Sequence, residues 1–213
     1  MRAIHRRLRA RFGPLEPPRR ADPLDELILT VLSQNTSDVN SERAFVALRA
    51  RFSSWAAAAR ARPASIAAAI RPGGLANVKA PRILAILREI GAPYDLGWMR
   101  GASDQEVRGY LLSLPGVGPK TAAVVLAFSL GRPALPVDTH VHRTAARLGL
   151  IPAKTTADAA HVLLERLVPA AIRVEMHVGL IRLGRKICRP GRPRCEECPL
   201  VDLCPTAPLY VRT

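Results

Sequence analysis

The sequence predicts an all-α protein, and three of its features lead to this prediction. Hydrophobic residues make up 48% of the 213-residue chain but aromatic residues only 4%, so alanine, leucine, valine and isoleucine must form the core. Apolar residues recur at helical spacing in successive segments, and proline, glycine or serine separates these segments. Counting the segments gives about ten or eleven helices and no credible set of strands.

The first part of the chain alternates helical segments with short polar or proline-containing breaks. Pro14, Pro17 and Pro18 end a basic first helix, whose charged face is either solvated or in contact with phosphate. Asp22 and Pro23 give the next helix an N-cap and a proline at its first position. The helices expected here are Met1 to Phe12, Leu24 to Leu32, Asn40 to Phe52, Ser53 to Arg60, Pro63 to Ile70 and Ala76 to Ile90.

The second part of the chain continues the helical pattern. Ser103 and Glu106 have the spacing of a capping box, which predicts a helix that begins near Asp104 and ends at Ser113. Either Thr155 or Thr156 caps a later helix. The helices expected after Ser113 are Thr121 to Leu130, entered from Pro119, then Thr139 to Leu148, a helix that ends at Leu167, and Ala170 to Arg185.

Charge and hydropathy limit the classes of function. The formal net charge is +15 and the pI is near 11.2, which is typical of proteins that bind a polyanion such as nucleic acid. The longest uninterrupted apolar run, Ala122 to Phe128, is far too short to span a membrane. Residues 1 to 20 carry seven arginines and no apolar signal region. We therefore expect a cytoplasmic protein, associated with the nucleoid, that has no membrane partner.

A glycine-rich and proline-rich hairpin precedes the most apolar helix. Leu114 to Gly118 reads LPGVG, a composition that ends one helix before the next begins. The N-terminus of a helix has unpaired backbone N–H groups and a partial positive charge, and glycine lets an anion approach the backbone. The hairpin therefore predicts a phosphate-binding site.

Lys120 stands in the first turn of the helix that follows this hairpin. Only four of the 32 basic residues are lysines, so arginine is the usual cation of this chain. A lysine amine, unlike an arginine, becomes a nucleophile when its surroundings disfavour the charged form. Lys120 is therefore either an amine nucleophile for a sugar or carbonyl carbon, or a point charge that binds phosphate.

Asp138 follows Pro136 and directly precedes the next helical run, so it is predicted to be an N-cap. A capping aspartate is a common structural feature. A carboxylate returned by the short loop Gly131 to Val137 can also face Lys120, and a carboxylate near a lysine nucleophile moves protons and stabilises a developing cation. The sequence leaves both roles open.

All four cysteines lie close together, with the spacing Cys188-x6-Cys195-x2-Cys198-x5-Cys204. A disulfide is a poor interpretation for a protein expected in the cytoplasm. Four thiolates in a short loop rich in proline and glycine indicate a metal centre. Zinc is the generic alternative, but a zinc ribbon normally has two close Cys-x2-Cys pairs and this loop has one.

The segments LPGVGPKTA and VDTHVHR and the cysteine spacing resemble those of the helix-hairpin-helix DNA glycosylases, most closely the endonuclease III family. The resemblance covers nearly the whole chain. It implies two helical domains with a DNA groove between them and an active site at their junction. Residues 22–132 would form a six-helix barrel that contains the helix-hairpin-helix motif. Residues 1–21 and 133–213 would form an iron-sulfur cluster domain.

The resemblance also implies a reaction and a cofactor. The protein would be a DNA N-glycosylase and AP lyase that removes oxidised pyrimidines and nicks the strand by β-elimination. Lys120 would form the Schiff base, and Asp138 would be the essential aspartate. A [4Fe-4S] cluster would be held by Cys188, Cys195, Cys198 and Cys204. The expected partner is double-stranded DNA with damaged bases or abasic sites, bound by a monomer.

Further DNA contacts are carried over from the same resemblance. Either Gln34 or Asn35 would fill the gap left by the flipped nucleotide, because holding that gap open offsets part of the cost of unstacking a base. The residues expected to contact DNA are Gln34, Asn35, Pro115, Gly116, Val117, Gly118, Thr121 and Lys186. Further cations expected around the cysteine loop are Arg182, Arg185, Arg189, Arg192 and Arg194.

Two departures from the family pattern leave the substrate open, and one of them is the order of Gln34 and Asn35, which differs from that in the family's Ser-x-Gln-x-Thr-Asp segment. Ala76 stands in the segment GLANVKA, where the family has a tyrosine. The alternatives are therefore a glycosylase for uracil or mismatched thymine, or for another modified base, and a DNA-damage-binding protein without catalytic activity. The presence of both Lys120 and Asp138 argues against the last of these, because binding alone needs neither residue.

Overall fold

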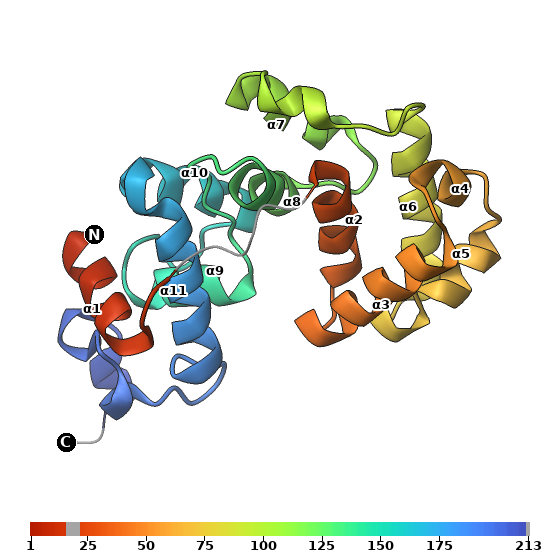
Figure 1. Cartoon of the computed structure of the whole chain (residues 1–213). Coiled ribbons are helices and arrows are strands. Elements are labelled where there is room, and N and C mark those ends of the chain that lie inside the picture. Colours follow the sequence, from red (N-terminus) through yellow and green to blue (C-terminus); the bar gives the residue numbers. More distant parts are fainter. Residues whose placement is uncertain (16–21, 212–213) are drawn as a thin grey trace. The chain divides into compact units, whose positions relative to one another are not determined.

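A computed structural model describes residues 1–15 and 22–211 of the chain. Within these residues it contains eleven α-helices, short 3-10 turns and no strand (Figure 1), which confirms the all-α prediction. The chain divides into a first unit, Met1–Arg19 with Arg132–Thr213, and a second unit, Arg20–Gly131. The assignment of these units to a barrel and a cluster domain stays a prediction. Pro17 and Pro18, expected to end the first helix, lie outside the described residues.

The second unit contains seven of the α-helices. They are α2 (Pro23–Ser33), α3 (Asp38–Arg51), α4 (Trp55–Ala59), α5 (Pro63–Ala69), α6 (Ala76–Ile90), α7 (Asp104–Ser113) and α8 (Pro119–Val124). The Asp22 carboxylate accepts the backbone N–H of Leu24 at 2.9 Å, so the predicted cap of α2 is confirmed. The capping box of Ser103 and Glu106 at the start of α7 is also present. Helix α3 begins earlier than expected because Ser37 caps it.

Helix α2 is the central element of this unit. It packs against α3, α6 and α8, and Leu27, Ile28 and Val31 on it are fully buried. Helix α6 contributes Ile83 and Leu84 to the buried set and packs against α5. The loop that leaves α2 and the hairpin that enters α8 are therefore both attached to the core of one unit.

The composition of the apolar segment after the hairpin predicted one regular α-helix, and this prediction is wrong. Helix α8 ends at Val124 and continues as a π-helical turn, η3 (Val125–Ser129), in which the Leu130 N–H donates to the Val125 carbonyl at 3.2 Å. The Arg100 guanidinium donates to the Ser129 carbonyl at 3.3 Å. A π turn is wider than an α turn, and this contact from outside the helix satisfies one of its carbonyl groups.

The first unit combines both ends of the chain. Its helices are α1 (Arg2–Phe12), α9 (Thr139–Arg147), α10 (Ala157–Leu167) and α11 (Arg173–Lys186), and three 3-10 turns follow between Cys195 and Leu209. Helix α11 packs against α1 and α9. At Gly179 of α11 a Cβ atom would lie 3.0 Å from Leu8, so glycine permits this close approach. Thr156, rather than Thr155, caps α10.

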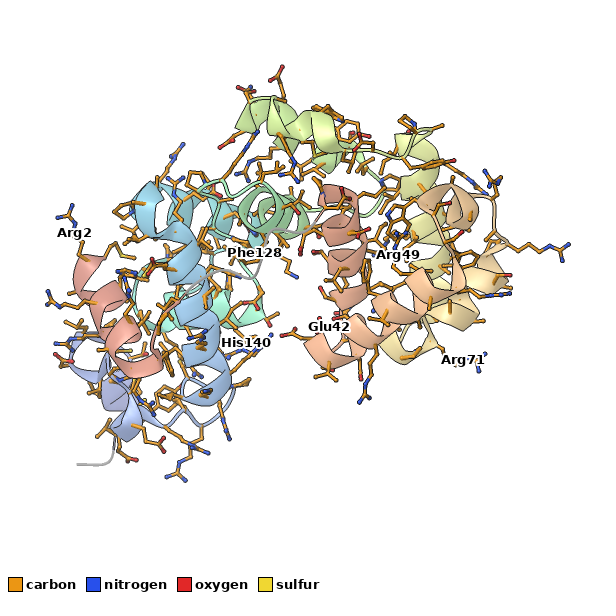
Figure 2. The ribbon with its side chains drawn as sticks, in the orientation of Figure 1. Arg2, Glu42, Arg49, Arg71, Phe128 and His140 are labelled. Atoms are coloured by element: carbon orange, nitrogen blue, oxygen red, sulfur yellow. The ribbon has the colours of Figure 1, made fainter. Side chains whose placement is uncertain are left out.

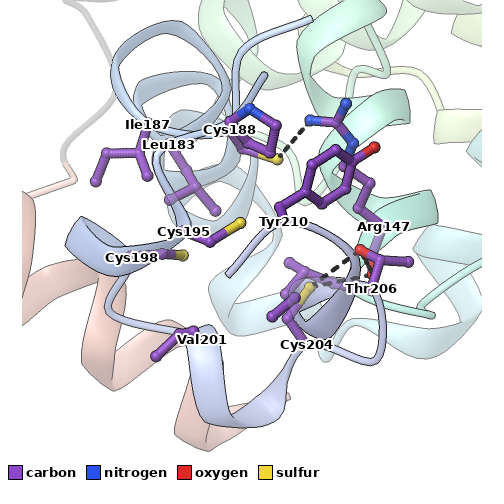
Figure 3. A pocket seen from close by; sticks show the side chains of 13 residues that line it. Arg147, Leu183, Ile187, Cys188, Cys195, Cys198, Val201, Cys204, Thr206 and Tyr210 are labelled. Atoms are coloured by element: carbon purple, nitrogen blue, oxygen red, sulfur yellow. Dashed lines mark hydrogen bonds between the residues drawn. The ribbon is translucent and has the colours of Figure 1, made fainter. Parts of the chain in front are cut away.

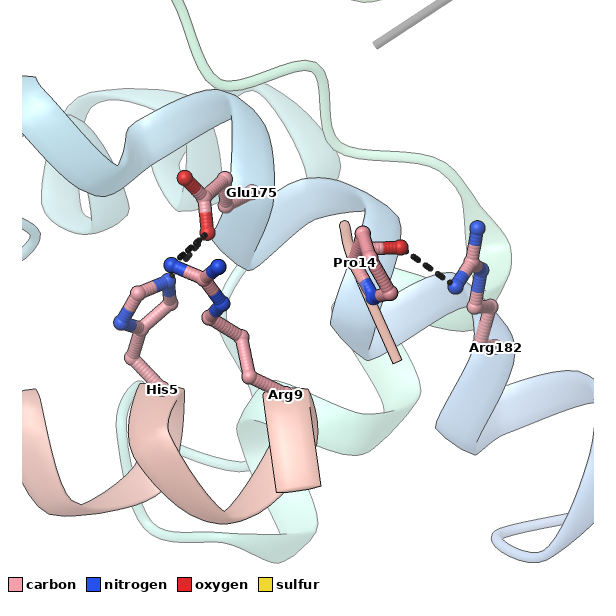
Figure 4. A network of polar contacts seen from close by, with 5 residues as sticks. All are labelled: His5, Arg9, Pro14, Glu175 and Arg182. Carbon is pink, nitrogen blue, oxygen red and sulfur yellow. Dashed lines mark hydrogen bonds and ion pairs between the residues drawn. The ribbon is translucent and has the colours of Figure 1, made fainter. Parts of the chain in front are cut away.

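Polar contacts connect α1 to α11 (Figure 4). The His5 Nε2 atom lies 2.7 Å from the Glu175 carboxylate, and Arg9 lies 3.7 Å from the same group. Arg182 donates to the carbonyl groups of Phe12 at 2.9 Å and Pro14 at 3.0 Å. Arg182, expected among the cations around the cysteine loop, is thus engaged with the C-terminal end of α1.

Arginine side chains extend from the helices into solvent, as Arg2 and Arg71 show (Figure 2). Their exposure agrees with the net charge of +15. Among the described residues, no helix is long and apolar enough to cross a membrane.

Candidate functional site

The hairpin between α7 and α8 has the predicted tight turn. Leu114 and Val117 are 3% and 6% exposed, so two apolar side chains anchor it to the second unit. The Val117 N–H donates to the Leu114 carbonyl at 3.1 Å and closes the turn. Gly116 has a φ of 72°, a conformation that favours glycine. Gly118 is then the N-cap of α8 and Pro119 its first residue.

The loop after α2 meets this hairpin through Arg82 of α6. The Arg82 guanidinium donates to the Gln34 amide oxygen at 2.6 Å, and the Gln34 amide nitrogen donates to the Gly116 carbonyl at 3.5 Å. A Cβ atom at Gly116 would lie 2.4 Å from the Arg82 Nε atom, so Arg82 runs directly beside the hairpin. Asn35, the next residue, is exposed and has a φ of 54°.

Lys120 is the second residue of α8 and is half-buried. Its charge acts on Glu26 of α2, a helix that packs against α8. Burial raises the pKa of the Glu26 carboxyl, although a hydrogen bond from Thr30 at 3.4 Å and the positive charge of Lys120 oppose this shift. Glu26 was not recognised from the sequence. The signal was a carboxylate among the apolar residues of a core helix.

Asp138 caps α9 in the first unit, as predicted. Its Oδ1 atom accepts the Val141 N–H at 2.7 Å. Lys120 belongs to the second unit and Asp138 to the first. The ring nitrogens of His142 and His177 form hydrogen bonds with the backbone carbonyl groups of Thr155 at 2.8 Å and Pro136 at 2.7 Å. Lys186 is exposed at the end of α11.

The four cysteines line one pocket of the first unit (Figure 3). All four are free cysteines. The rest of the lining is mostly apolar, and Leu183 and Ile187 contribute to it. Burial, together with the negative charge of the other three sulfurs, raises the pKa of Cys198 to about 11, although a backbone hydrogen bond opposes this shift.

Arg147 of α9 is the cation beside these thiols. It donates to the Cys188 sulfur at 3.4 Å and to the Arg189 carbonyl at 2.8 Å, and its guanidinium lies 5.2 Å from the centre of the Tyr210 ring. The Arg147 carbonyl accepts a hydrogen bond from the Cys204 thiol at 3.3 Å. A hydrogen bond donated to a cysteine sulfur, such as that from Arg147 to Cys188, and an apolar surrounding are features of iron-sulfur sites.

The geometry of the pocket can be compared with that of a single metal ion. Within the described ranges, no three His, Cys, Asp or Glu side chains gather closely enough to hold one ion. Four cysteine sulfurs around one pocket are a ligand set that suits either zinc or an iron-sulfur cluster.

Comparisons with known proteins agree with these features. The family model for HhH-GPD superfamily base excision DNA repair proteins matches residues 28–170. Endonuclease III of Thermotoga maritima is 38% identical over 86% of this chain and 83% of that protein. Endonuclease III of Escherichia coli is 34% identical over 86% of this chain and 84% of that protein.

Solved structures show the same fold. A trapped endonuclease III–DNA covalent intermediate matches with a TM-score of 0.85 and 27% identity, over 99% of this chain and 97% of that one. A thermostable thymine-DNA glycosylase matches with a TM-score of 0.80 and 24% identity, over 98% of this chain and 94% of that one, which shows likeness of fold alone.

Proposed function

The chain belongs to the HhH-GPD superfamily of base excision DNA repair proteins, and on this premise we propose that it is a bifunctional DNA glycosylase and AP lyase for oxidised pyrimidines in duplex DNA. The observation that carries the proposal is the likeness to endonuclease III, in sequence over 86% of the chain and in fold to a DNA-bound covalent intermediate. The enzyme acts as a monomer on nucleoid DNA in the cytoplasm.

Lys120 is the nucleophile of the proposed reaction. Its neutral amine attacks C1′ of the lesion nucleotide, the glycosidic bond breaks, and the base leaves with the bonding electron pair and gains a proton. Ring opening of the sugar gives a Schiff base. Loss of a proton from C2′ then breaks the C3′–O bond, and the strand on the 3′ side leaves with a phosphate at its 5′ end. Water hydrolyses the Schiff base and returns Lys120 to its starting state.

Asp138 supplies the carboxylate of this reaction. A carboxylate accepts the proton that the lysine amine loses and stabilises positive charge on the sugar. The hydrogen bond from Val141 holds the Asp138 side chain in one orientation at the start of α9, which supports a positioned group rather than a mobile one.

The hairpin and the loop after α2 are the proposed DNA contacts of the second unit. Backbone N–H groups of Gly116, Gly118 and Thr121 bind phosphate. Pro115, which has no N–H, and Val117, whose N–H donates to the Leu114 carbonyl, contact DNA through other atoms of the hairpin. Asn35 is the better candidate to fill the gap left by the flipped nucleotide, because it is exposed whereas Gln34 is hydrogen-bonded to Arg82 and Gly116. Exposed Lys186 contributes a phosphate contact from the first unit.

The four cysteines hold a [4Fe-4S] cluster in this proposal. Their common pocket, its apolar lining and the hydrogen bond from Arg147 to Cys188 support the assignment. The cluster braces the loop between Cys188 and Cys204, which carries exposed Arg189 and Arg192 for phosphate binding.

Borohydride trapping tests the proposal. Wild type, Lys120→Ala and the exposed-lysine control Lys154→Ala are incubated with duplexes that carry an abasic site, thymine glycol, or uracil or thymine opposite guanine. We expect a covalent adduct with the first two duplexes, retained in Lys154→Ala and lost in Lys120→Ala. Adduct formation in Lys120→Ala would disprove the nucleophile. Adducts with the abasic and mismatched duplexes, but none with thymine glycol, would replace the assigned substrate.

A further inference from the structure

Two basic residues of α6, Lys79 and Arg82, support the loop that leaves α2. They are three residues apart, a spacing that places side chains on one face of a helix. Lys79 is buried and donates to the carbonyl groups of Leu32 at 2.6 Å and Gly73 at 2.8 Å. The base of the loop is therefore fixed to the core of the second unit.

Arg82 holds the first residue of this loop, Gln34. Its bond of 2.6 Å to the Gln34 amide oxygen is a short, charge-assisted hydrogen bond. Gln34 in turn contacts the Gly116 carbonyl, and the missing side chain of Gly116 leaves the space through which Arg82 passes. Arg82 thus joins the loop after α2 to the hairpin, two segments 82 residues apart in the chain.

We infer that Arg82 is a positioning residue for base extrusion, which locks Gln34 against the hairpin and thereby fixes exposed Asn35 for insertion into the duplex. The inference rests on the proposed function. Arg82 acts through Gln34 and not on the reacting atoms. The hairpin glycine has a second role here, because any side chain at Gly116 would displace the Arg82 guanidinium.

The physical effect is preorganisation. A loop that is already held in its DNA-bound arrangement does not lose conformational freedom when the damaged duplex binds. Undamaged duplex, from which no base is extruded, gains nothing from the fixed loop. Losing the Arg82–Gln34 bond is therefore expected to weaken binding to a damaged site roughly tenfold and to leave binding to undamaged duplex nearly unchanged.

A double-mutant cycle tests the inference. Affinities of wild type, Arg82→Ala, Gln34→Ala and the double variant are measured for a duplex with a tetrahydrofuran abasic analogue and for undamaged duplex. Fluorescence of 2-aminopurine opposite the analogue reports unstacking. We expect the ratio of affinities for damaged and undamaged duplex to fall about tenfold in each single variant. In the double variant this ratio should fall by the same factor and no further. Additive losses would overturn the inference.

Two control variants separate positioning from charge. Arg88→Ala removes the same charge from an exposed position of the same helix and should weaken binding to both duplexes alike. Arg82→Lys keeps the charge without the planar fork and should lose most of the preference for the damaged duplex. Full preference in Arg82→Lys would show that charge alone suffices. If the wild type forms no borohydride adduct, the proposed function is rejected. If the wild type is active but the losses of the two single variants add up in the double variant, only the role of Arg82 is rejected.

Discussion

The Lys79 ammonium nitrogen lies 2.6 Å from the Leu32 carbonyl oxygen, and the Lys79 residue is only 2% exposed. The same ammonium group donates to the Gly73 carbonyl at 2.8 Å. Both carbonyl groups stand at helix ends, where the backbone lacks its own donor. Burial lowers the pKa of Lys79, so the charge is costly and the two hydrogen bonds offset part of that cost.

Lys79→Met should therefore destabilise the fold even though methionine has a similar length. The change leaves two buried carbonyl groups without a donor, and each such group costs about 1–3 kcal/mol. We expect a clearly lower urea midpoint by far-UV circular dichroism. Lys154→Met, at an exposed lysine, should stay within about 0.5 kcal/mol of wild type. Equal midpoints for the two variants would contradict this view of Lys79.

Features that depend on neighbouring residues could be predicted from the sequence. The caps at Asp22, Ser103 and Asp138 are as expected, because a cap is made by a side chain and the backbone two or three residues away. The bounds of α6 and α7 are also as expected. The gathering of the four cysteines around one pocket is likewise as expected, because all four lie in one short stretch of the chain.

Features that depend on distant residues could not be predicted. The π turn after α8 carries no distinctive composition, and Arg100 supports it from another element. Arg82 and Lys79 looked like ordinary cations of a basic helix, and only the fold brings them to Gln34 and Leu32. The buried Glu26 was missed because helical periodicity does not show which neighbour faces a given side chain.

Glu26→Gln should stabilise the protein at neutral pH. Burial raises the pKa of Glu26 above its usual 4.5. Between pH 4.5 and the raised pKa, the folded state therefore binds more protons than the unfolded state. Stability is therefore lost as pH rises through this window, and the full loss persists above it. The neutral glutamine avoids this loss and still accepts the Thr30 hydrogen bond. Urea unfolding should show a gain at pH 7.5 that disappears below about pH 4.5.

Glu106→Gln provides a control of opposite sign. Hydrogen bonds from Ser103 lower the pKa of the exposed Glu106 carboxylate, so its contribution is present above its unfolded pKa and is lost as pH falls. The Glu106 variant should be slightly less stable than wild type at pH 7.5. The assigned burial of Glu26 would be wrong if both variants shifted stability in the same direction.

Cys195→Ser should remove the metal centre. Wild type is expected to contain about four iron and four sulfide ions per chain, whereas a zinc site would contain one zinc ion and no sulfide. The variant should lose iron, sulfide and visible absorbance together, and its first unit should become sensitive to proteolysis. Elemental analysis and limited proteolysis measure these changes. Zinc at one ion per chain in wild type would reject the iron-sulfur assignment.

Two substitutions at Asp138 separate its structural role from its proposed chemical one. Asparagine is about as good an N-cap as aspartate, so Asp138→Asn should keep α9 and the stability of wild type. Asp138→Ala loses the bond to Val141 and should cost about 1 kcal/mol. Both variants lose the carboxylate that accepts a proton, so both should slow single-turnover Schiff-base formation by at least about 100-fold.

Asp138→Asn and Asp138→Ala are expected to differ in stability but to lose activity alike, so comparing them separates the cap from the proton acceptor. Near-wild-type trapping in Asp138→Asn, measured at several pH values, would show that Asp138 serves only as the cap of α9. The proton would then have to leave the Lys120 amine by another route. The half-buried carboxyl of Glu26, on which Lys120 acts within the same unit, would be the next acceptor to test.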